Sequence, residues 1–244
     1  MTVFGELLAP KYLVWLIQGF GVTVVLAALA SLAATALGFV LCLGRLARSR
    51  WLAWPVAGYL SLFRNTPLLI QLFFWYFGST ALMSEGLLEW LNTPHQLDMV
   101  VFGIKWPPFE YLAGFVGLTL YTSAFIAEEF RAGVGGVPAG QVTAAAALGM
   151  TRYQIWRHIV MPQAIRIAMP PLLGQYMNTL KNSSLTMAIG LAELSYASRQ
   201  VETETFKTFQ AFGIATLLYI GSIVLIETTG QWLQHRRKLI GAPL

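Results

Sequence analysis

Charged residues are scarce in this chain of 244 residues. Asp, Glu, Lys and Arg make up 11% of it, whereas an ordinary soluble domain carries roughly 25%. A soluble protein of this length could not cover its surface with so few charges, so the composition excludes an ordinary cytosolic enzyme, a disordered linker and a fibrous protein. Cysteine is nearly absent too, and the single Cys42 excludes an internal disulfide and any metal site built from several cysteines.

Motifs for catalysis and for nucleotide binding are also missing. The three histidines are far apart in the sequence, so no metal site is predicted. There is no Gly-x-Ser-x-Gly elbow for covalent hydrolysis. Gly135 and Gly140 have the separation of a phosphate-binding P-loop, but Gln141 and Val142 stand where Lys and Ser or Thr are required. The chain is therefore predicted not to be an enzyme and to bind no cofactor. Any energy-requiring process in which it takes part must be driven by another polypeptide or by an ion gradient.

Long apolar runs are the main feature of the sequence. Hydrophobic residues make up 56% of the chain and the mean hydropathy is +0.61, which suits a membrane protein. A membrane-spanning helix needs about 20 apolar residues. Uncharged runs cover residues 12–44 and 208–226, with a shorter one at 111–127, and two further apolar segments lie at 65–84 and 167–180. The prediction is an all-α membrane protein with about five transmembrane helices.

The distribution of charge predicts the orientation of these helices. Basic residues without matching acids follow the first, third and fifth spans: Arg45, Arg48, Arg50, Arg131, Arg152, Arg157, Arg236, Arg237 and Lys238. The connections at 85–110 and 193–207 are acidic instead. Cytoplasmic loops are enriched in Lys and Arg, so the N-terminus is predicted outside and the C-terminus in the cytoplasm. The net charge of +5 then reflects membrane topology, and no nucleic-acid partner is predicted.

This orientation gives a simple domain organisation. Residues 1–18 are predicted to form an extracytoplasmic N-terminal segment, and residues 19–233 the transmembrane domain. Residues 234–244 are predicted to form a cytoplasmic basic tail.

The segment at 132–162 differs from the apolar runs around it. Its first part is rich in glycine, which interrupts the preceding helix. A helix-forming run at 143–148 is followed by Gly149, and a second helical stretch at 153–160 mixes aromatic, apolar and basic residues. Pro162 suits the first turn of the next helix. Two interpretations fit this pattern: an element that docks another protein, or an amphipathic helix that lies on lipid headgroups.

The same segment resembles the coupling loop of the permease subunits of bacterial ABC importers. That loop has the form EAA, three residues, Gly, nine residues, I-x-L-P. This chain preserves every interval, and the residues that match are Thr143, Ala144, Ala145, Gly149, Ile159 and Pro162. Two residues depart from the pattern, because Thr143 replaces the acid and Met161 replaces the leucine. The first change removes a carboxylate and any ionic contact that it makes, although a threonine is able to cap the start of a helix.

The resemblance extends over residues 19–232 and is greatest to the polar amino acid branch of these permeases. It includes the stretches FRNTPLLIQLFFWY at 63–76 and LKNSSL at 180–185. It implies the type I importer fold in a bacterial inner membrane, with the matching residues of the 132–162 segment coupling the chain to a separate ATPase. The implied partners are two ATP-binding-cassette subunits that use the ATP, a second permease (identical or homologous), an extracytoplasmic solute-binding protein, an amino acid substrate and the lipid bilayer. The sequence is most similar to those of glutamate/aspartate permeases, while glutamine and basic amino acids stay open as substrates.

Two rival classes make different predictions from the sequence. An ion-coupled secondary transporter or channel predicts an inverted repeat and buried acids in the middle of spans. An intramembrane enzyme predicts paired catalytic groups or metal ligands inside the spans. We find neither pattern in this sequence.

Ionisable and polar residues near the spans are the candidates for the transport pathway. Arg64 either faces the pathway and binds a substrate carboxylate, or extends to the cytoplasmic interface as a simple anchor, which is the simpler interpretation. Gln175, Asn178 and Asn182 lie on roughly one face of a helix that lines the pathway in this hypothesis. Glu128 and Glu129 are expected to pair locally with Arg131.

Proline affects the helix that carries these amides. Pro170 and Pro171 lie inside the segment at 167–180. Proline lacks the backbone N–H of a helical hydrogen bond, so we expect a kink or a break there.

Overall fold

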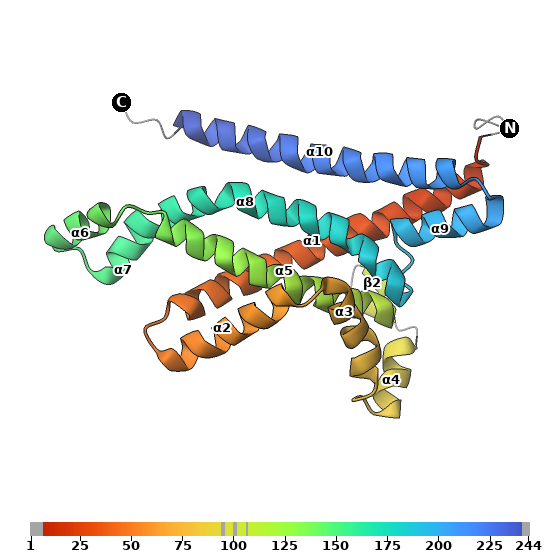
Figure 1. The fold of residues 1–244 in the computed structure, drawn as a ribbon, viewed down its shortest axis with the longest axis horizontal. Helices are drawn as coiled ribbons and strands as arrows, with labels where there is room; N and C mark the ends of the chain where they lie inside the picture. Colours follow the sequence, from red (N-terminus) through yellow and green to blue (C-terminus); the bar gives the residue numbers. More distant parts are fainter. Residues whose placement is uncertain (1–6, 94–95, 100–101, 106, 241–244) are drawn as a thin grey trace. The chain divides into compact units, whose positions relative to one another are not determined.

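Helices make up most of the computed structural model, which describes residues 7–93, 96–99, 102–105 and 107–240 (Figure 1). The elements in chain order are α1 (Pro10–Leu46), α2 (Arg50–Asn65), α3 (Leu68–Phe73), the π-helical turn η1 (Phe74–Gly78), α4 (Glu85–Asn92), β1 (Gln96–Met99), β2 (Phe102–Lys105), α5 (Phe109–Gly135), α6 (Ala139–Ala147), α7 (Arg152–Ile155), the π-helical turn η2 (Trp156–Val160), α8 (Met161–Asn182), the 3-10 helix η3 (Ser183–Ile189), α9 (Leu194–Thr205) and α10 (Thr208–Ile240). Parts of the predicted end segments, residues 1–6 and 241–244, lie outside the described residues.

Three helices are long and apolar enough to cross a membrane. They are α1, α5 and the part of α10 from Thr208 to Trp232, which confirms the first, third and fifth predicted spans. The predicted span at 65–84 is shorter in the structure, where apolar helix covers only Leu68–Gly78. The fourth predicted span corresponds to α8, whose 22 residues include several polar side chains. The count of five spans therefore stays a prediction.

Two elements were not expected in the connections between spans. The first is α2, which lies between the first and second predicted spans and ends before the Thr66-Pro67 pair. The second is an antiparallel hairpin, in which β1 pairs with β2 in the register Gln96 to Lys105. Among the described residues this hairpin is the exception to the predicted all-α class.

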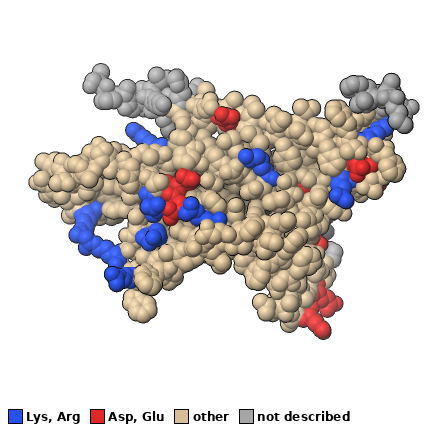
Figure 2. Space-filling model, viewed as in Figure 1, with Lys and Arg blue, Asp and Glu red and all other residues tan. Residues whose placement is uncertain are grey.

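The chain forms two compact units, and each is considered by itself. Unit 1 combines the residues up to Ala30 with 66–119 and 179–222, and unit 2 combines 31–65, 120–178 and the residues from Ile223 onward. Figure 2 shows that acidic and basic side chains occupy a small part of the visible surface. This is the expected result for a chain that meets lipid over much of its area.

Unit 1 contains a fully buried carboxylate, that of Glu193. It accepts hydrogen bonds from Thr23 Oγ1 at 3.1 Å and from the Tyr219 hydroxyl at 2.9 Å. It also accepts one from the backbone N–H of Tyr196 at 3.0 Å, which caps the start of α9. Burial raises the pKa of Glu193 above its ordinary value, while these donors oppose that shift. The carboxylate thereby joins α1, α9 and α10 through one buried polar centre.

Unit 2 depends on small residues where its helices approach closely. A Cβ at Gly133 of α5 would lie 2.5 Å from the carbonyl oxygen of Ala164 in α8. Only glycine therefore allows this helix pair to pack as it does. Ala168 and Leu172 of α8 are buried in the same unit.

The structure contradicts a break at the paired prolines. The helix α8 continues through Pro170 and Pro171 from Met161 to Asn182. Two missing N–H donors are too few to end a helix that is held on both sides by regular turns and by buried Ala168 and Leu172. The prediction of a break is wrong, and whether the helix bends there stays untested.

Candidate functional site

The segment at 132–162 forms a compact helical element with a small core of its own. Helix α5 ends at Gly135, and α6, α7 and η2 follow. The buried apolar residues of this core are Val137, Ala145, Ile155, Val160 and Ala164. Because α6 and α7 pack on this core, the turn between them is held at the end of the element (Figure 1).

Gly149 makes the turn between α6 and α7. Its φ is +80°, a left-handed conformation that favours glycine. The N–H of Gly149 donates to the carbonyl of Ala146 at 3.0 Å, and the N–H of Met150 donates to the carbonyl of Ala145 at 3.2 Å. A left-handed glycine that satisfies the last carbonyls in this way is a standard helix ending. The motif glycine therefore has a backbone function.

The start of α7 is fixed by a capping box. The Thr151 hydroxyl accepts a hydrogen bond from the backbone N–H of Gln154, and the Gln154 side chain accepts one from the N–H of Thr151. Pro162 is the second residue of α8, but α8 continues the π-helical turn η2 without any non-helical residue, so Pro162 does not begin a new helix and that expectation is wrong. The chain is thus tightly specified on both sides of the turn.

Thr143 does not cap a helix, so that expectation is wrong. Helix α6 begins at Ala139, after Pro138, and Thr143 lies in its second turn. The Thr143 hydroxyl instead donates to the carbonyl of Ala139 at 3.1 Å. The helix starts earlier than expected because Pro138 initiates it, which places Thr143 on an exposed helical surface.

The residues that match the coupling motif differ in their exposure. Ala145 is buried in the core of the element, and Ile159 is half-buried against that core. The other four are exposed: Thr143, Ala144, Gly149 and Pro162. Next to the motif, Leu148 is 84% exposed and Tyr153 is 70% exposed. Large apolar side chains are thus exposed at both sides of the glycine turn, as at a docking surface.

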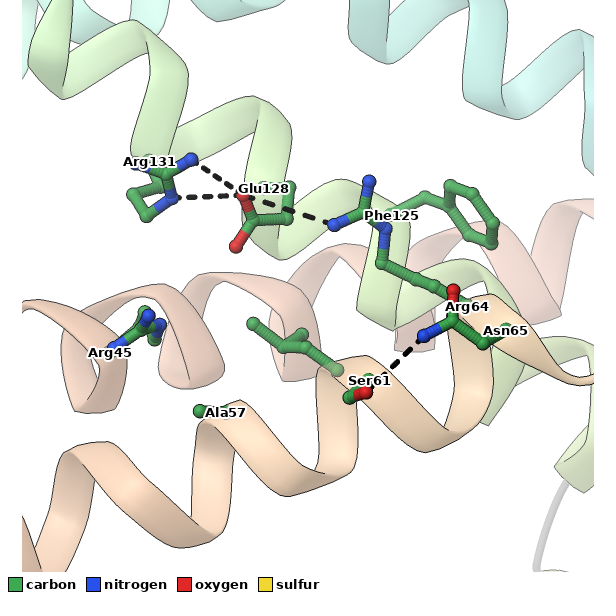
Figure 3. A pocket seen from close by; sticks show the side chains of 9 residues that line it. Arg45, Ala57, Ser61, Arg64, Asn65, Phe125, Glu128 and Arg131 are labelled. Atoms are coloured by element: carbon green, nitrogen blue, oxygen red, sulfur yellow. Dashed lines mark hydrogen bonds and ion pairs between the residues drawn. The ribbon is translucent and has the colours of Figure 1, made fainter.

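Unit 2 also contains a polar cavity of about 540 Å³, which is lined by residues of α1, α2 and α5 (Figure 3). Arg131 Nε and Nη2 donate to Glu128 Oε2 at 2.9 and 2.7 Å. Arg64 Nη1 lies 4.0 Å from the same oxygen, and its guanidinium lies 5.4 Å from the centre of the Phe125 ring. Arg45 also lines the cavity. With three arginines and one glutamate, the charged lining has an excess of positive charge and suits an anion.

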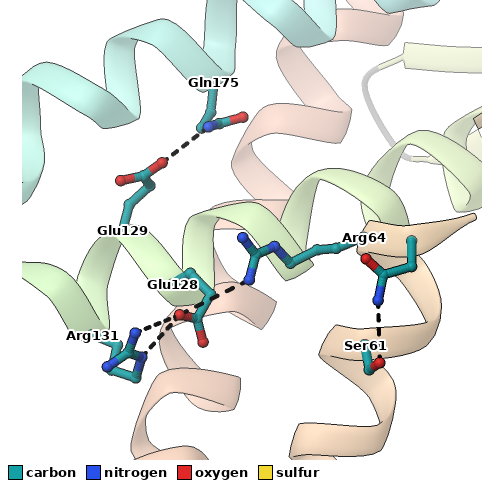
Figure 4. A network of polar contacts seen from close by, with 7 residues as sticks. Ser61, Arg64, Glu128, Glu129, Arg131 and Gln175 are labelled. Atoms are coloured by element: carbon teal, nitrogen blue, oxygen red, sulfur yellow. Dashed lines mark hydrogen bonds and ion pairs between the residues drawn. The ribbon is translucent and has the colours of Figure 1, made fainter.

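The amide of Gln175 contacts an acid of α5. Its Nε2 donates to Glu129 Oε1 at 3.1 Å, which connects α8 to α5 (Figure 4). Glu128 pairs with Arg131 as expected, but this contact of Glu129 was not anticipated. Asn178 is exposed near the same end of α8, and Asn182 is the last residue of that helix and belongs to unit 1. The structure therefore joins Gln175 to Glu129 of α5.

The convergence of Arg45 and Arg64 on Glu128 was not evident from the sequence. The available signal was that these residues were all assigned to the same side of the membrane. Charge alone does not tell which helices are neighbours, so the pairing needed the structure. In the described parts of the chain, no three His, Cys, Asp or Glu residues lie close enough to hold a metal ion. The arrangement can bind charged groups but offers no nucleophile paired with a base.

Known proteins resemble this chain along most of its length. The sequence model of the family described as "binding-protein-dependent transport system inner membrane component" matches residues 34–238. The chain is 31% identical over 210 residues to the glutamate/aspartate import permease protein GltJ of Escherichia coli (strain K12), which covers 86% of this chain and 81% of that protein. It is 33% identical over 219 residues to the probable glutamine ABC transporter permease protein GlnM of Bacillus subtilis (strain 168), which covers 90% and 91%.

A solved structure is similar as well. The crystal structure of an amino acid ABC transporter with histidines matches with a TM-score of 0.76 and 27% identity. The match covers 93% of this chain and 95% of that chain.

Proposed function

The chain belongs to the family of binding-protein-dependent transport system inner membrane components, and we propose that it conducts an acidic amino acid, glutamate or aspartate, across the membrane. It is a permease subunit of an amino acid ABC importer with the type I fold. As such it is a multi-pass component of the inner membrane, and its family consists of transporter subunits rather than enzymes.

The proposed assembly contains more than this chain. An ABC importer permease works with an ATPase and a substrate-binding protein. We place two ATPase subunits and a second permease, identical or homologous, in the complex. In this proposal ATP is used by the partner subunits, the basic loops face the cytoplasm, the N-terminus is outside and the C-terminus is inside.

The observation that carries the proposed coupling to an ATPase is the exposed glycine turn of the element at 132–162. Leu148 and Tyr153 offer apolar contact area on either side of Gly149. Thr143 and Ala144 are accessible on the neighbouring surface of α6. Such an element, fixed by its own small core, can transmit a displacement of a docked ATPase to α8, which follows it directly in the chain.

The first experiment asks whether a separate P-loop ATPase purifies with the tagged chain. We expect it to be retained, and amino acid uptake into liposomes to require ATP. The variant Gly149→Pro should insert into the membrane normally but lose both ATPase attachment and uptake, because proline cannot adopt a φ of +80°. Uptake without ATP by the chain alone would favour an ion-coupled transporter or channel instead.

The cationic cavity supports the choice of an acidic substrate. An acidic amino acid has two carboxylates and one ammonium group, and the charged lining at Arg45, Arg64 and Arg131 exceeds the single Glu128. Arg64 is better placed than Arg131 to bind a substrate carboxylate, because Arg131 already binds Glu128 closely. Gln175, Asn178 and Asn182 remain proposed pathway residues. Similarity to both a glutamate/aspartate and a glutamine permease gives the two substrates to compare.

A substrate comparison tests this part of the proposal. In the assembled transporter, Arg64→Gln should lower the uptake of glutamate by about tenfold or more, since a hydrogen bond to a charged group contributes roughly 1.5–3 kcal/mol. Glutamine uptake should change much less. The matched control is Arg48→Gln, because Arg48 is exposed and does not line the cavity. Unchanged glutamate uptake at normal expression would show that Arg64 is only an interfacial anchor.

A further inference from the structure

A groove in unit 2 combines apolar and basic walls in a way that the transport pathway does not explain. It has a volume of about 760 Å³ and lies between the second half of α1 and the segment from α7 to α8. Phe39 and Leu43 of α1 and Ile165 of α8 form its apolar part, while Arg157 and His158 of η2 line its other part. The groove is separate from the cavity at Arg64, with which it shares no lining residue.

We propose that this groove binds an anionic phospholipid, with an acyl chain against Phe39, Leu43 and Ile165 and the phosphate at Arg157 and His158. Two of these apolar residues, Phe39 and Leu43, belong to α1, a helix that is long and apolar enough to cross the membrane. Leu43 and Ile165 are exposed large apolar residues. Hydrocarbon is the natural neighbour of such side chains on a membrane helix.

The charge of the groove selects an anionic headgroup. No Asp or Glu lines the groove. Within the described parts of the chain, both ion pairs involve Glu128, and neither involves Arg157. Arginine binds phosphate through several N–H donors at once. Basic pockets between membrane helices are a known way to bind phosphate headgroups.

Two further features fit a lipid rather than a soluble anion. Tyr153 and Trp156 also line the groove, and these residue types are enriched where membrane meets water. Phe39 makes an edge-to-face contact with Phe130, whose ring centre is 5.5 Å away, and this contact supports one residue of the apolar wall. The π-helical turn η2 carries Trp156, Arg157 and His158 together. Such turns occur frequently at functional sites.

The site lies next to the coupling element, so lipid occupancy would affect its position. Trp156 and Ile159 pack against the small core that holds α6 and α7. The two interpretations of the 132–162 segment then apply to different parts of it. The glycine turn, flanked by Leu148 and Tyr153, meets a protein partner. The basic and aromatic residues Trp156, Arg157 and His158 of η2 meet the membrane interface.

The test measures phospholipid retained by the assembled transporter after detergent exchange, by mass spectrometry. The complex is first equilibrated with phosphatidylglycerol or with phosphatidylcholine that has the same acyl chains. We expect preferential retention of phosphatidylglycerol, and Arg157→Gln should reduce that preference about fivefold, the effect of one basic residue near an anionic surface. Arg152→Gln is the matched control, because Arg152 is exposed nearby but does not line the groove.

Three results would overturn the proposal. Equal retention of the two lipids would remove the headgroup selectivity, and equal losses in the Arg157 and Arg152 variants would remove the site. Displacement of the lipid by millimolar glycerol phosphate, at no cost to thermal stability, would show that the groove binds a soluble anion. ATPase retention is measured in each variant, so a failure of coupling is distinguished from a failure of lipid binding.

Discussion

Gly140→Ala and Gly149→Ala make the same chemical change in the coupling element and should have opposite effects on its stability. A new Cβ would meet no atom within 4 Å at either position, so steric conflict with neighbours does not enter. Gly140 is the second residue of α6, where alanine is more favourable than glycine by up to about 0.5–1 kcal/mol. Gly149 has a φ of +80°, where an L-residue costs about 1–2 kcal/mol.

The expected difference between the two variants is therefore up to about 1.5–3 kcal/mol, or roughly tenfold to a hundredfold in the local opening equilibrium. Hydrogen exchange of peptides from 139–162 measures this equilibrium directly. Gly149→Ala should exchange faster than wild type and retain less ATPase, and Gly140→Ala should exchange more slowly. Gly149→Asn should lie between wild type and Gly149→Ala, because asparagine tolerates the left-handed region better than alanine. Equal exchange in the two alanine variants would refute the assignment of Gly149 as a backbone determinant of the turn.

Three other substitutions test the packing and the polar centre. Gly133→Ala should destabilise the protein by about 1–3 kcal/mol in thermal unfolding, because the new Cβ would press on the Ala164 carbonyl. Gly135→Ala is the control, because a Cβ there would have no atom within 4 Å. Thr151→Ala removes the capping box and should cost about 1 kcal/mol, seen as faster hydrogen exchange in α7. Glu193→Gln should cost about 1–3 kcal/mol in thermal unfolding, because a buried acceptor is replaced in part by a donor. Because the native pKa of Glu193 is raised, the native state holds that proton more tightly than the unfolded chain, so its stability falls as the pH rises through the raised pKa. The stability of the wild type should therefore fall as the pH rises above 4.5, the ordinary pKa of Glu, whereas that of the glutamine variant should not. The difference in stability between wild type and variant should then shrink with rising pH, and parallel stability profiles would contradict the argument.

The predictions that the structure confirms rest on sequence features whose structural consequence follows from simple physical rules. The three uncharged runs lie in α1, α5 and α10, the helices that are long and apolar enough to cross a membrane. The glycine turn at Gly149 followed from a motif whose intervals are preserved. By contrast, α2 was missed because its uncharged stretch at 51–63 is shorter than a membrane span and contains Pro55.

Contacts between distant segments were the part that the sequence could not supply. Arg64 and Glu128 lie on different helices, and no local pattern indicates that they meet. Glu193 was assigned to an acidic connection, but partners at Thr23 and Tyr219 bury it. The expectation for Thr143 failed for a local reason, since Pro138 began the helix earlier than the alanine run suggested.

The helical path from α7 through η2 to α8 has a mechanical consequence. It has no non-helical residue from Arg152 to Asn178, a distance of about 40 Å at 1.5 Å per residue. Pro170 and Pro171 leave the carbonyls of Arg166 and Ile167 without their usual donors, so bending costs least there. In the proposed importer this path would carry a displacement of the glycine turn toward Gln175, and the two prolines mark the place where the path would bend most easily.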